Sequence, residues 1–116
     1  MWVKFIVFRR CKLFYKKDAS YAEKGVGTLH LKKTKEDKTQ LVIRADTTLG
    51  NILLNIFLNP QITTQRVGKN NVMLVCVPNP PIDPKNPSSV PTPMLLRVKT
   101  DSDADQLLKK LDEAKQ

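Results

Sequence analysis

The stretch Tyr21-Ala22-Glu23-Lys24-Gly25-Val26-Gly27-Thr28-Leu29-His30-Leu31 decides the fold class, because it places two glycines directly before a strand with alternating apolar residues. A glycine pair that cradles phosphate instead follows a strand and opens a helix, whose amide groups hold the anion. His30 also occupies the position of the third glycine in a dinucleotide-binding motif. The stretch therefore argues against a nucleotide site. It predicts that Gly25 and Gly27 form a turn with positive φ or allow a close approach by a partner.

Strand patterns continue from this stretch along most of the chain. Short apolar runs, often alternating with polar residues, predict strands at residues 8–15, 26–32, 41–44, 52–58, 62–67, 72–77 and 94–99. The run at 52–58 could also be a helix, but turn residues at both ends favour a strand. We expect loops at 32–38 and 46–50. Seven of the eight prolines lie between Pro78 and Pro93, which predicts an extended surface loop there.

The C-terminus alone carries helix signals. Thr100 or Asp101 can cap the first turn, aspartates follow near the positive end of the helix dipole, and lysines lie toward the other end. One face is apolar and is expected to face the core, with Ala104, Leu107, Leu108, Leu111 and Ala114. About seven antiparallel strands followed by one amphipathic helix predict a mainly β fold, a pleckstrin-homology-like barrel capped by the C-terminal helix.

The charge of the chain limits its partners. The formal net charge is +9, and six basic residues but no acidic one precede Asp18. A field of this sign favours an acidic partner, which could be nucleic acid, anionic lipid or an acidic protein segment. A solvated basic face without a partner stays an alternative.

Neither catalysis nor a metal site finds support in the sequence. The single histidine, His30, lies within a predicted strand, and no ligand spacing of a metal site is present. Cys11 and Cys76 lie in apolar runs, so we expect buried free thiols rather than a disulfide. The apolar start is interrupted by Lys4 and resembles neither a signal peptide nor a membrane span. We expect a binding module that is no enzyme and has no cofactor, metal or membrane span.

Several motifs in fixed order resemble the Ran-binding domain family. They are Cys-Lys-Leu-Phe-Tyr at 11–15, Glu-Lys-Gly-Val-Gly at 23–27, Leu-Val-Ile-Arg-Ala-Asp at 41–46, Leu-Gly-Asn-Ile-Leu-Leu-Asn at 49–55, and the last strand with its helix. Segments 68–72 and 75–83 resemble the nucleoporin members of that family in particular. The resemblance divides the chain into a divergent N-terminal segment, 1–10, and a Ran-binding domain, 11–116.

The resemblance implies non-catalytic binding of the small GTPase Ran in its GTP form, in nucleocytoplasmic transport. The location implied is the nucleus, at the nuclear pore complex. In this family the GTPase extends an acidic C-terminal tail around the barrel onto a basic surface. Transport receptors would be met indirectly, nucleic acid would not be bound, and the domain would be a monomer.

Site residues follow from the resemblance by motif position. Three residues would shape the contact loop, namely Glu23, Lys24 and Gly25. Arg44 would meet acidic groups of the GTPase, while Asp46 would orient its turn, with Asn51 and Asn55 as weaker candidates. Lys12, Lys17 and Lys69 are assigned to the basic face only by charge and by proximity to the motifs. Plain alternatives stay open, since Arg44 could be solvated, Asp46 only a turn former, and both asparagines structural.

The competing hypothesis is a module that binds phosphoinositides at a membrane surface. Lys12, Lys16, Lys17 and the loop 32–38 could bind a phosphoinositide, with Trp2 and Phe5 entering the interface. Such a site would not need the motifs at 23–27 and 44–46. Nucleic acid binding ranks third, because the aromatic residues cluster near the N-terminus instead of alternating with basic ones across strands.

Overall fold

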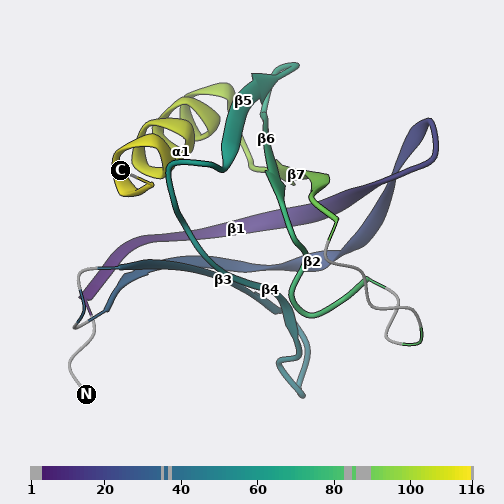
Figure 1. Cartoon of the computed structure of the whole chain (residues 1–116), viewed down its shortest axis with the longest axis horizontal. Coiled ribbons are helices and arrows are strands. Elements are labelled where there is room, and N and C mark those ends of the chain that lie inside the picture. The colour runs from purple at the N-terminus through teal and green to yellow at the C-terminus, as the bar shows by residue number, and fades with distance from the viewer. Residues whose placement is uncertain (1–3, 35, 37, 83–84, 86–89, 116) are drawn as a thin grey trace.

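Seven strands and one helix form the described part of this computed structural model, which covers residues 4–34, 36, 38–82, 85 and 90–115. The elements are β1 (Lys4–Lys17), β2 (Ser20–Lys33), β3 (Thr39–Ala45), β4 (Ile52–Phe57), β5 (Thr63–Val67), β6 (Asn71–Cys76), β7 (Thr92–Arg97) and α1 (Asp101–Ala114). Figure 1 shows a strongly curved sheet with α1 beside β5. The predicted mainly β fold with one C-terminal helix is confirmed.

The strands form one antiparallel sheet in the order β4-β3-β2-β1-β7-β6-β5. β1 pairs with β2 over its whole length and with β7 at Lys12–Tyr15. Because this single long strand joins both halves, the sheet can curve until the two halves face each other, as Figure 1 shows. The arrangement places β2 and β3 side by side, which positions the candidate site.

The first two strands are longer than predicted because they form one hairpin. The chain reverses at Asp18-Ala19, where Asp18 has φ 56°, a conformation that aspartate adopts more readily than most residues. Residues 20–25 belong to β2, so the turn predicted there is wrong. Residues 16–20 are exposed and residues 21, 22, 24 and 25 are only partly buried, so this end of the hairpin lacks the alternation of buried and exposed residues that marks a half-buried strand.

Strand β7 begins two residues earlier than predicted and includes Pro93. Pro93 pairs with Val75 of β6, whereas pairing with β1 extends only to Met94. Pro93 therefore lies where β7 is still an edge, the position in a sheet that tolerates a missing N–H. The described parts of the preceding segment, 77–82, 85 and 90–91, contain no strand, in agreement with the predicted loop.

The C-terminal helix begins as the sequence predicts. The Thr100 side chain accepts a hydrogen bond of 3.0 Å from the Asp103 amide, so Thr100 is the N-cap. The predicted apolar face is turned toward the core, where Ala104, Leu107 and Leu111 are buried. Within the described residues, no helix is long and apolar enough to cross a bilayer.

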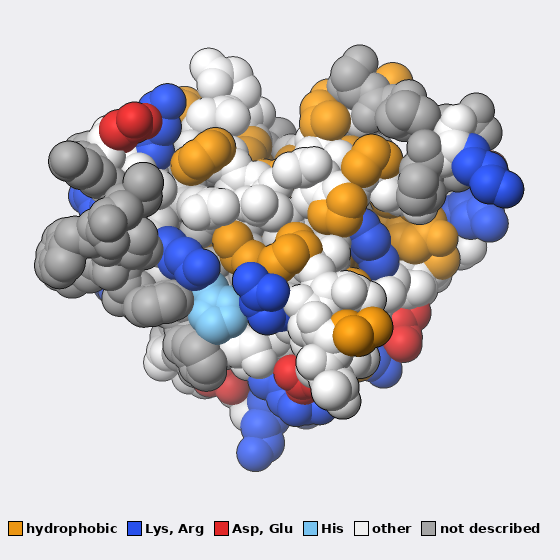
Figure 2. All heavy atoms as spheres, turned by 90° about the horizontal axis from the view of Figure 1, so that it is seen from below, with side chains coloured by type: hydrophobic (Ala, Val, Ile, Leu, Met, Phe, Trp, Pro, Cys, Tyr) orange, Lys and Arg blue, Asp and Glu red, His pale blue; other side chains and the backbone are white. Residues whose placement is uncertain are grey.

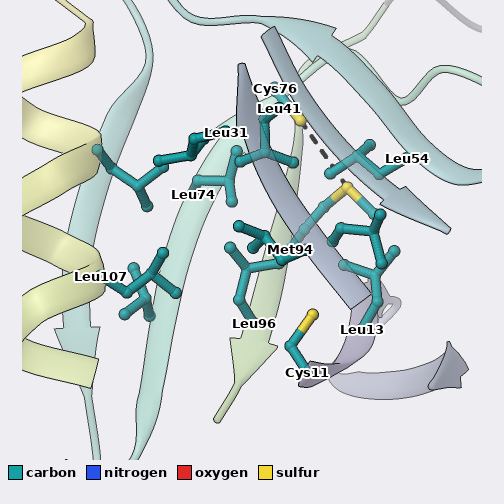
Figure 3. Packing of buried hydrophobic residues seen from close by; sticks show 14 of the residues in the cluster. Cys11, Leu13, Leu31, Leu41, Leu54, Leu74, Cys76, Met94, Leu96 and Leu107 are labelled. Atoms are coloured by element: carbon teal, nitrogen blue, oxygen red, sulfur yellow. Dashed lines mark hydrogen bonds between the residues drawn. The ribbon is translucent and has the colours of Figure 1, made fainter. Parts of the chain in front are cut away.

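A leucine-rich core fills the space between the sheet halves and the helix. Figure 3 shows side chains from both halves meeting there, among them Leu13, Leu31, Leu41, Leu54, Leu74, Met94, Leu96 and Leu107. Cys11 and Cys76 are buried free thiols, as predicted. Burial raises the pKa of Cys11 to about 12 and that of Cys76 to about 11, so both thiols are protonated at neutral pH.

Candidate functional site

The two glycines of the motif at 23–27 lie inside β2 and act by lacking a side chain. The only described residues with φ in the left-handed region are Asp18, Gly50 and Gly68, so positive φ at Gly25 and Gly27 is excluded. A Cβ at Gly27 would lie 2.7 Å from the carbonyl carbon of Arg44 and closer still to its oxygen. The predicted close approach is therefore real, but the neighbour is β3 of the same chain.

Lys24 is the extra residue of a β-bulge. Gly25 pairs with Leu13, and Glu23 pairs with Phe14, so Lys24 has no opposite residue on β1. The Lys24 ammonium lies 3.4 Å from the carbonyl oxygen of Pro80, to which it donates a hydrogen bond. Partial burial lowers the pKa of Lys24. The Lys24 side chain therefore binds the segment that follows β6. Glu23, Lys24 and Gly25, which the resemblance assigned to a contact loop, lie on strand β2 instead.

Glu23 and Lys12 form an ion pair across β1 and β2. The Lys12 ammonium lies 3.3 Å from a Glu23 carboxylate oxygen, and both side chains are about half exposed. Each therefore reduces the charge that the other presents to a partner. A phosphoinositide at Lys12 would have to approach this carboxylate, which weakens the membrane-surface hypothesis.

The turn between β3 and β4, residues 46–50, is held by the two charged residues of the motif at 41–46, Arg44 and Asp46. One Arg44 guanidinium nitrogen donates to the Gly50 carbonyl oxygen at 2.9 Å. One carboxylate oxygen of Asp46 accepts a hydrogen bond of 3.4 Å from the Thr28 hydroxyl, and the other forms an ion pair with Arg10. Arg44 thus fixes the end of the turn, while Asp46 fixes its beginning against β1 and β2.

Asn55 and Asn51 make contacts that serve the fold. The Asn55 side-chain oxygen accepts from the Gln40 amide group at 2.6 Å. The backbone N–H of Asn55 donates to the Asn79 carbonyl at 2.6 Å, and the Asn79 side chain donates back to the Asn55 carbonyl at 3.0 Å. The Asn51 carbonyl accepts from the Ala45 amide at 2.7 Å. The Asn55 side chain therefore has the structural contact that the plain alternative expects, whereas Asn51 contributes its backbone carbonyl.

The three lysines of the predicted basic face do not gather at one point. Lys12 lies in the middle of β1 and Lys17 at its end, so five residues of extended strand, roughly 16 Å, separate them. Lys69 is exposed in the turn between β5 and β6. Lys12 pairs with Arg97 of β7, and Arg97 pairs with Asn71 of β6. This row of paired residues leads from Lys12 toward Lys69, and Lys17 does not belong to it.

The face seen in Figure 2 mixes basic and hydrophobic side chains around His30. Burial, reinforced by the nearby charges of Lys32 and Arg44, lowers the pKa of His30, so the imidazole is neutral at pH 7. Among the residues described, no group of three His, Cys, Asp or Glu side chains could hold a metal ion. Of the aromatic residues that the membrane hypothesis uses, Trp2 lies outside the described residues, and only the backbone of Phe5 is described.

A small apolar pocket lies between the ends of β4 and β6. Its volume is about 320 Å³, and its lining includes Phe57, Ile62, Val75 and Val77. The Phe57 ring is half exposed, with the Lys38 ammonium 5.9 Å from its centre. The sequence did not indicate this pocket, because its walls come from three separate stretches of the chain, 56–63, 75–77 and Pro91.

Sequence reasoning missed Arg10 and Thr28 as members of the candidate site. Both lie in one row of the sheet, since Arg10 pairs with Thr28 and Thr28 pairs with Arg44. Alternation along a strand places Thr28 on the same face as His30, but only the strand register shows that Asp46 contacts both Arg10 and Thr28. The prediction assigned Arg10 to the divergent segment and so separated it from the site.

A curved seven-stranded sheet capped by a C-terminal helix is the architecture of pleckstrin-homology-like binding modules. Residues 4–116 match the family model of the RanBP1 domain, and the chain belongs to that family. It is therefore a non-catalytic binding module. The backbone of residues 4–10 pairs as part of β1, and the predicted division at residue 10 stays a prediction.

Known relatives and structures agree with this assignment. The chain is 62% identical over 107 residues to nuclear pore complex protein Nup50 of Homo sapiens. The aligned region covers 92% of this chain and 23% of that protein. The values are the same for Nup50 of Mus musculus. The chain thus spans about a quarter of the length of these relatives. A crystal structure of the Ran-binding domain of Nup2 from Ashbya gossypii shares the fold, with a TM-score of 0.79 at 20% identity over 97% of this chain and 95% of that one.

Proposed function

We propose that this chain binds the small GTPase Ran in its GTP-loaded form. The observation that carries the proposal is the family match, which extends over residues 4–116 and so includes every strand and the helix. A match of this extent covers the whole folded unit, unlike a single short motif. Every described strand and the helix therefore lie within the part of the chain that matches a RanBP1-type domain.

The geometry of the candidate site supports the proposal by joining two of the motifs that carried the resemblance, those at 23–27 and 41–46. The amide of Asp46 donates to the carbonyl oxygen of Val26 at 3.1 Å, and Gly27 lies directly against the Arg44 carbonyl. The segment 23–27, inside β2, and the segment 44–46, at the end of β3, are therefore in direct contact. We propose that Glu23, Lys24, Gly25, Arg44 and Asp46 build the contact surface, with Asn51 and Asn55 supporting it.

The charge of the domain supports an acidic partner. With a net charge of +9, the chain attracts an acidic surface or tail over distances of about a Debye length, which is close to 8–10 Å at physiological salt. Such attraction raises the association rate and orients the encounter more than it adds affinity. We propose that the acidic C-terminal tail of the GTPase follows the basic face, including Lys12, Lys17 and Lys69.

We place this activity at the nuclear pore complex in the nucleus, because the 62% identical relatives are nuclear pore complex proteins by name. The domain would act there as a monomer and would meet transport receptors only indirectly, through the GTPase. No described residue indicates a cofactor requirement.

Binding of the purified chain to Ran loaded with a GTP analogue, and separately with GDP, tests the proposal. The expected result is binding that strongly prefers the GTP analogue and that Arg44→Ala weakens. Lys109→Ala is the matched control, because Lys109 is an exposed cation on α1, away from β2 and β3. Equal binding of both nucleotide forms, or no binding at all, would contradict the proposal.

A further inference from the structure

We infer that Leu49, at the tip of the β3–β4 turn, inserts into an apolar recess of the GTPase, and that Arg44 and Asp46 act as positioning residues that hold this turn. The inference rests on the proposed function and names the residue that makes the contact. It differs from the expectation that Arg44 acts by meeting acidic groups directly.

Leu49 is the most exposed of the described large hydrophobic residues. Its exposed fraction is 83%, compared with 64% for Val90 and 54% for Phe57. A single exposed leucine is by itself common on protein surfaces. What sets Leu49 apart is that several interactions fix the backbone on both sides of it.

The turn that carries Leu49 is closed by its own backbone. The Ala45 amide donates to the Asn51 carbonyl at 2.7 Å across the base of the turn. The Gly50 amide donates to the carbonyl of Thr47 at 3.0 Å and lies 3.2 Å from its hydroxyl. Gly50 has φ 61°, which glycine adopts without strain. A turn fixed in this way loses little conformational entropy when its tip is bound.

The charged residues of the motif reinforce the same turn from the outside. The Arg44 side chain lies along Gly50, since a Cβ at Gly50 would be 3.5 Å from Arg44 Cδ, and its guanidinium binds the Gly50 carbonyl. The Asp46 carboxylate is held by Arg10 and Thr28. Both motif residues therefore direct interactions inward to the turn, and the large apolar side chain that the turn presents to a partner is Leu49.

The surroundings of Leu49 define the partner surface. The bond between the Asp46 amide and the Val26 carbonyl joins the first residue of the turn to the segment 23–27, so the turn that carries Leu49 adjoins the candidate contact surface. Arg10 forms an ion pair with Asp46, and Arg44 donates to the Gly50 carbonyl, so the charges at the base of the turn are directed to the turn itself. The surface that matches the tip of the turn is therefore an apolar recess.

The test compares Leu49→Ala, Arg44→Ala and the double variant in calorimetric binding to GTP-analogue-loaded Ran, at about 0.05 and 0.3 M salt. We expect each single change to weaken binding by about tenfold. If Arg44 acts through Leu49, the double variant binds about as weakly as either single one, and the effect of Arg44→Ala is the same at both salt concentrations. Val90→Ala, which removes another exposed apolar side chain, leaves the affinity unchanged.

The outcomes separate this inference from the proposed function. If Leu49→Ala binds like the wild type, the inference is overturned while Ran binding stands. An Arg44→Ala effect that shrinks with salt and adds fully to that of Leu49→Ala would also overturn it, because Arg44 would then contact the partner itself. If the wild-type chain binds neither nucleotide form, the proposed function fails and the inference fails with it. Since the Leu49 side chain is exposed, an unchanged melting temperature shows that Leu49→Ala is folded.

Discussion

Gly27→Ala tests the closest contact between the two halves of the candidate site. The added Cβ would lie 2.7 Å from the Arg44 carbonyl carbon and nearer to its oxygen, whereas real Cβ atoms essentially never come within 3.0 Å of another heavy atom. Restoring an ordinary carbon–oxygen distance of about 3.3–3.6 Å requires β2 and β3 to separate by roughly 1 Å. The Arg44 backbone cannot yield easily, because it is paired with β2 on one side and β4 on the other.

The cost of this separation can be worked out from the bonds nearby. The bond between the Asp46 amide and the Val26 carbonyl is 3.1 Å long, and a shift of roughly 1 Å takes it beyond hydrogen-bond range. Losing one such bond costs about 1 kcal/mol. Overpacking a tight site costs about 1–3 kcal/mol more. We therefore expect Gly27→Ala to lower the free energy of unfolding by about 3 kcal/mol, and the melting temperature by roughly 10 °C.

Gly25→Ala is the matched control for this prediction. Its Cβ would lie 3.0 Å from the end of the Leu53 side chain, which can rotate away, so the cost should stay below about 1 kcal/mol. Neither glycine has positive φ, so neither change strains the backbone. Urea and thermal unfolding of both variants measure the difference. A Gly27→Ala variant as stable as Gly25→Ala would refute the argument that contact with the β3 backbone requires this glycine.

Three further predictions concern stability. Thr100→Ala should cost about 1 kcal/mol in thermal unfolding because α1 loses its N-cap, while Thr100→Ser should retain most of the stability. Asn79→Ala removes a hydrogen bond to the Asn55 carbonyl, so the Asn55 amide should exchange its hydrogen faster with solvent. An unchanged exchange rate would contradict the conclusion that the Asn79 side chain holds the segment after β6 against β4. Between pH 9 and about 11, Cys11 and Cys76 lose their thiol protons in the unfolded state but retain them in the folded state, so the free energy of unfolding should fall as pH rises. The midpoint of urea unfolding should fall less over this range in the Cys11→Ala, Cys76→Ala double variant.

Local patterns were sufficient to predict most elements of the fold. The helix begins at Thr100 and turns its apolar face inward because capping and helical spacing are encoded within one segment. Leu29 and Leu31 are fully buried, as their alternation with polar residues predicts. The two errors have physical reasons: the β1–β2 hairpin is exposed on both faces near Asp18, and Pro93 lies where β7 still forms an edge.

The candidate site could be predicted only in part, because its contacts depend on strand register. The sequence indicated that Gly27 permits a close approach, but the approaching atom belongs to Arg44, which lies on the next strand. Similarly, nothing local connects Arg10 with Asp46. One bulge, at Lys24, changes which residues of β1 and β2 are opposite each other, and this insertion has no reliable sequence pattern.

The charged residues of the two motifs contribute more to the shape of the surface than to its free charge. Glu23 is paired with Lys12, Asp46 with Arg10, and Arg44 with a backbone carbonyl. Exposed ion pairs of this kind add little stability individually, but together with the backbone bonds they fix where the turn lies relative to β2. The long-range attraction of an acidic partner must then come mainly from the excess lysines and arginines elsewhere on the chain. Net charge would therefore govern the rate of association, while the geometry of the turn would govern how long the complex lasts.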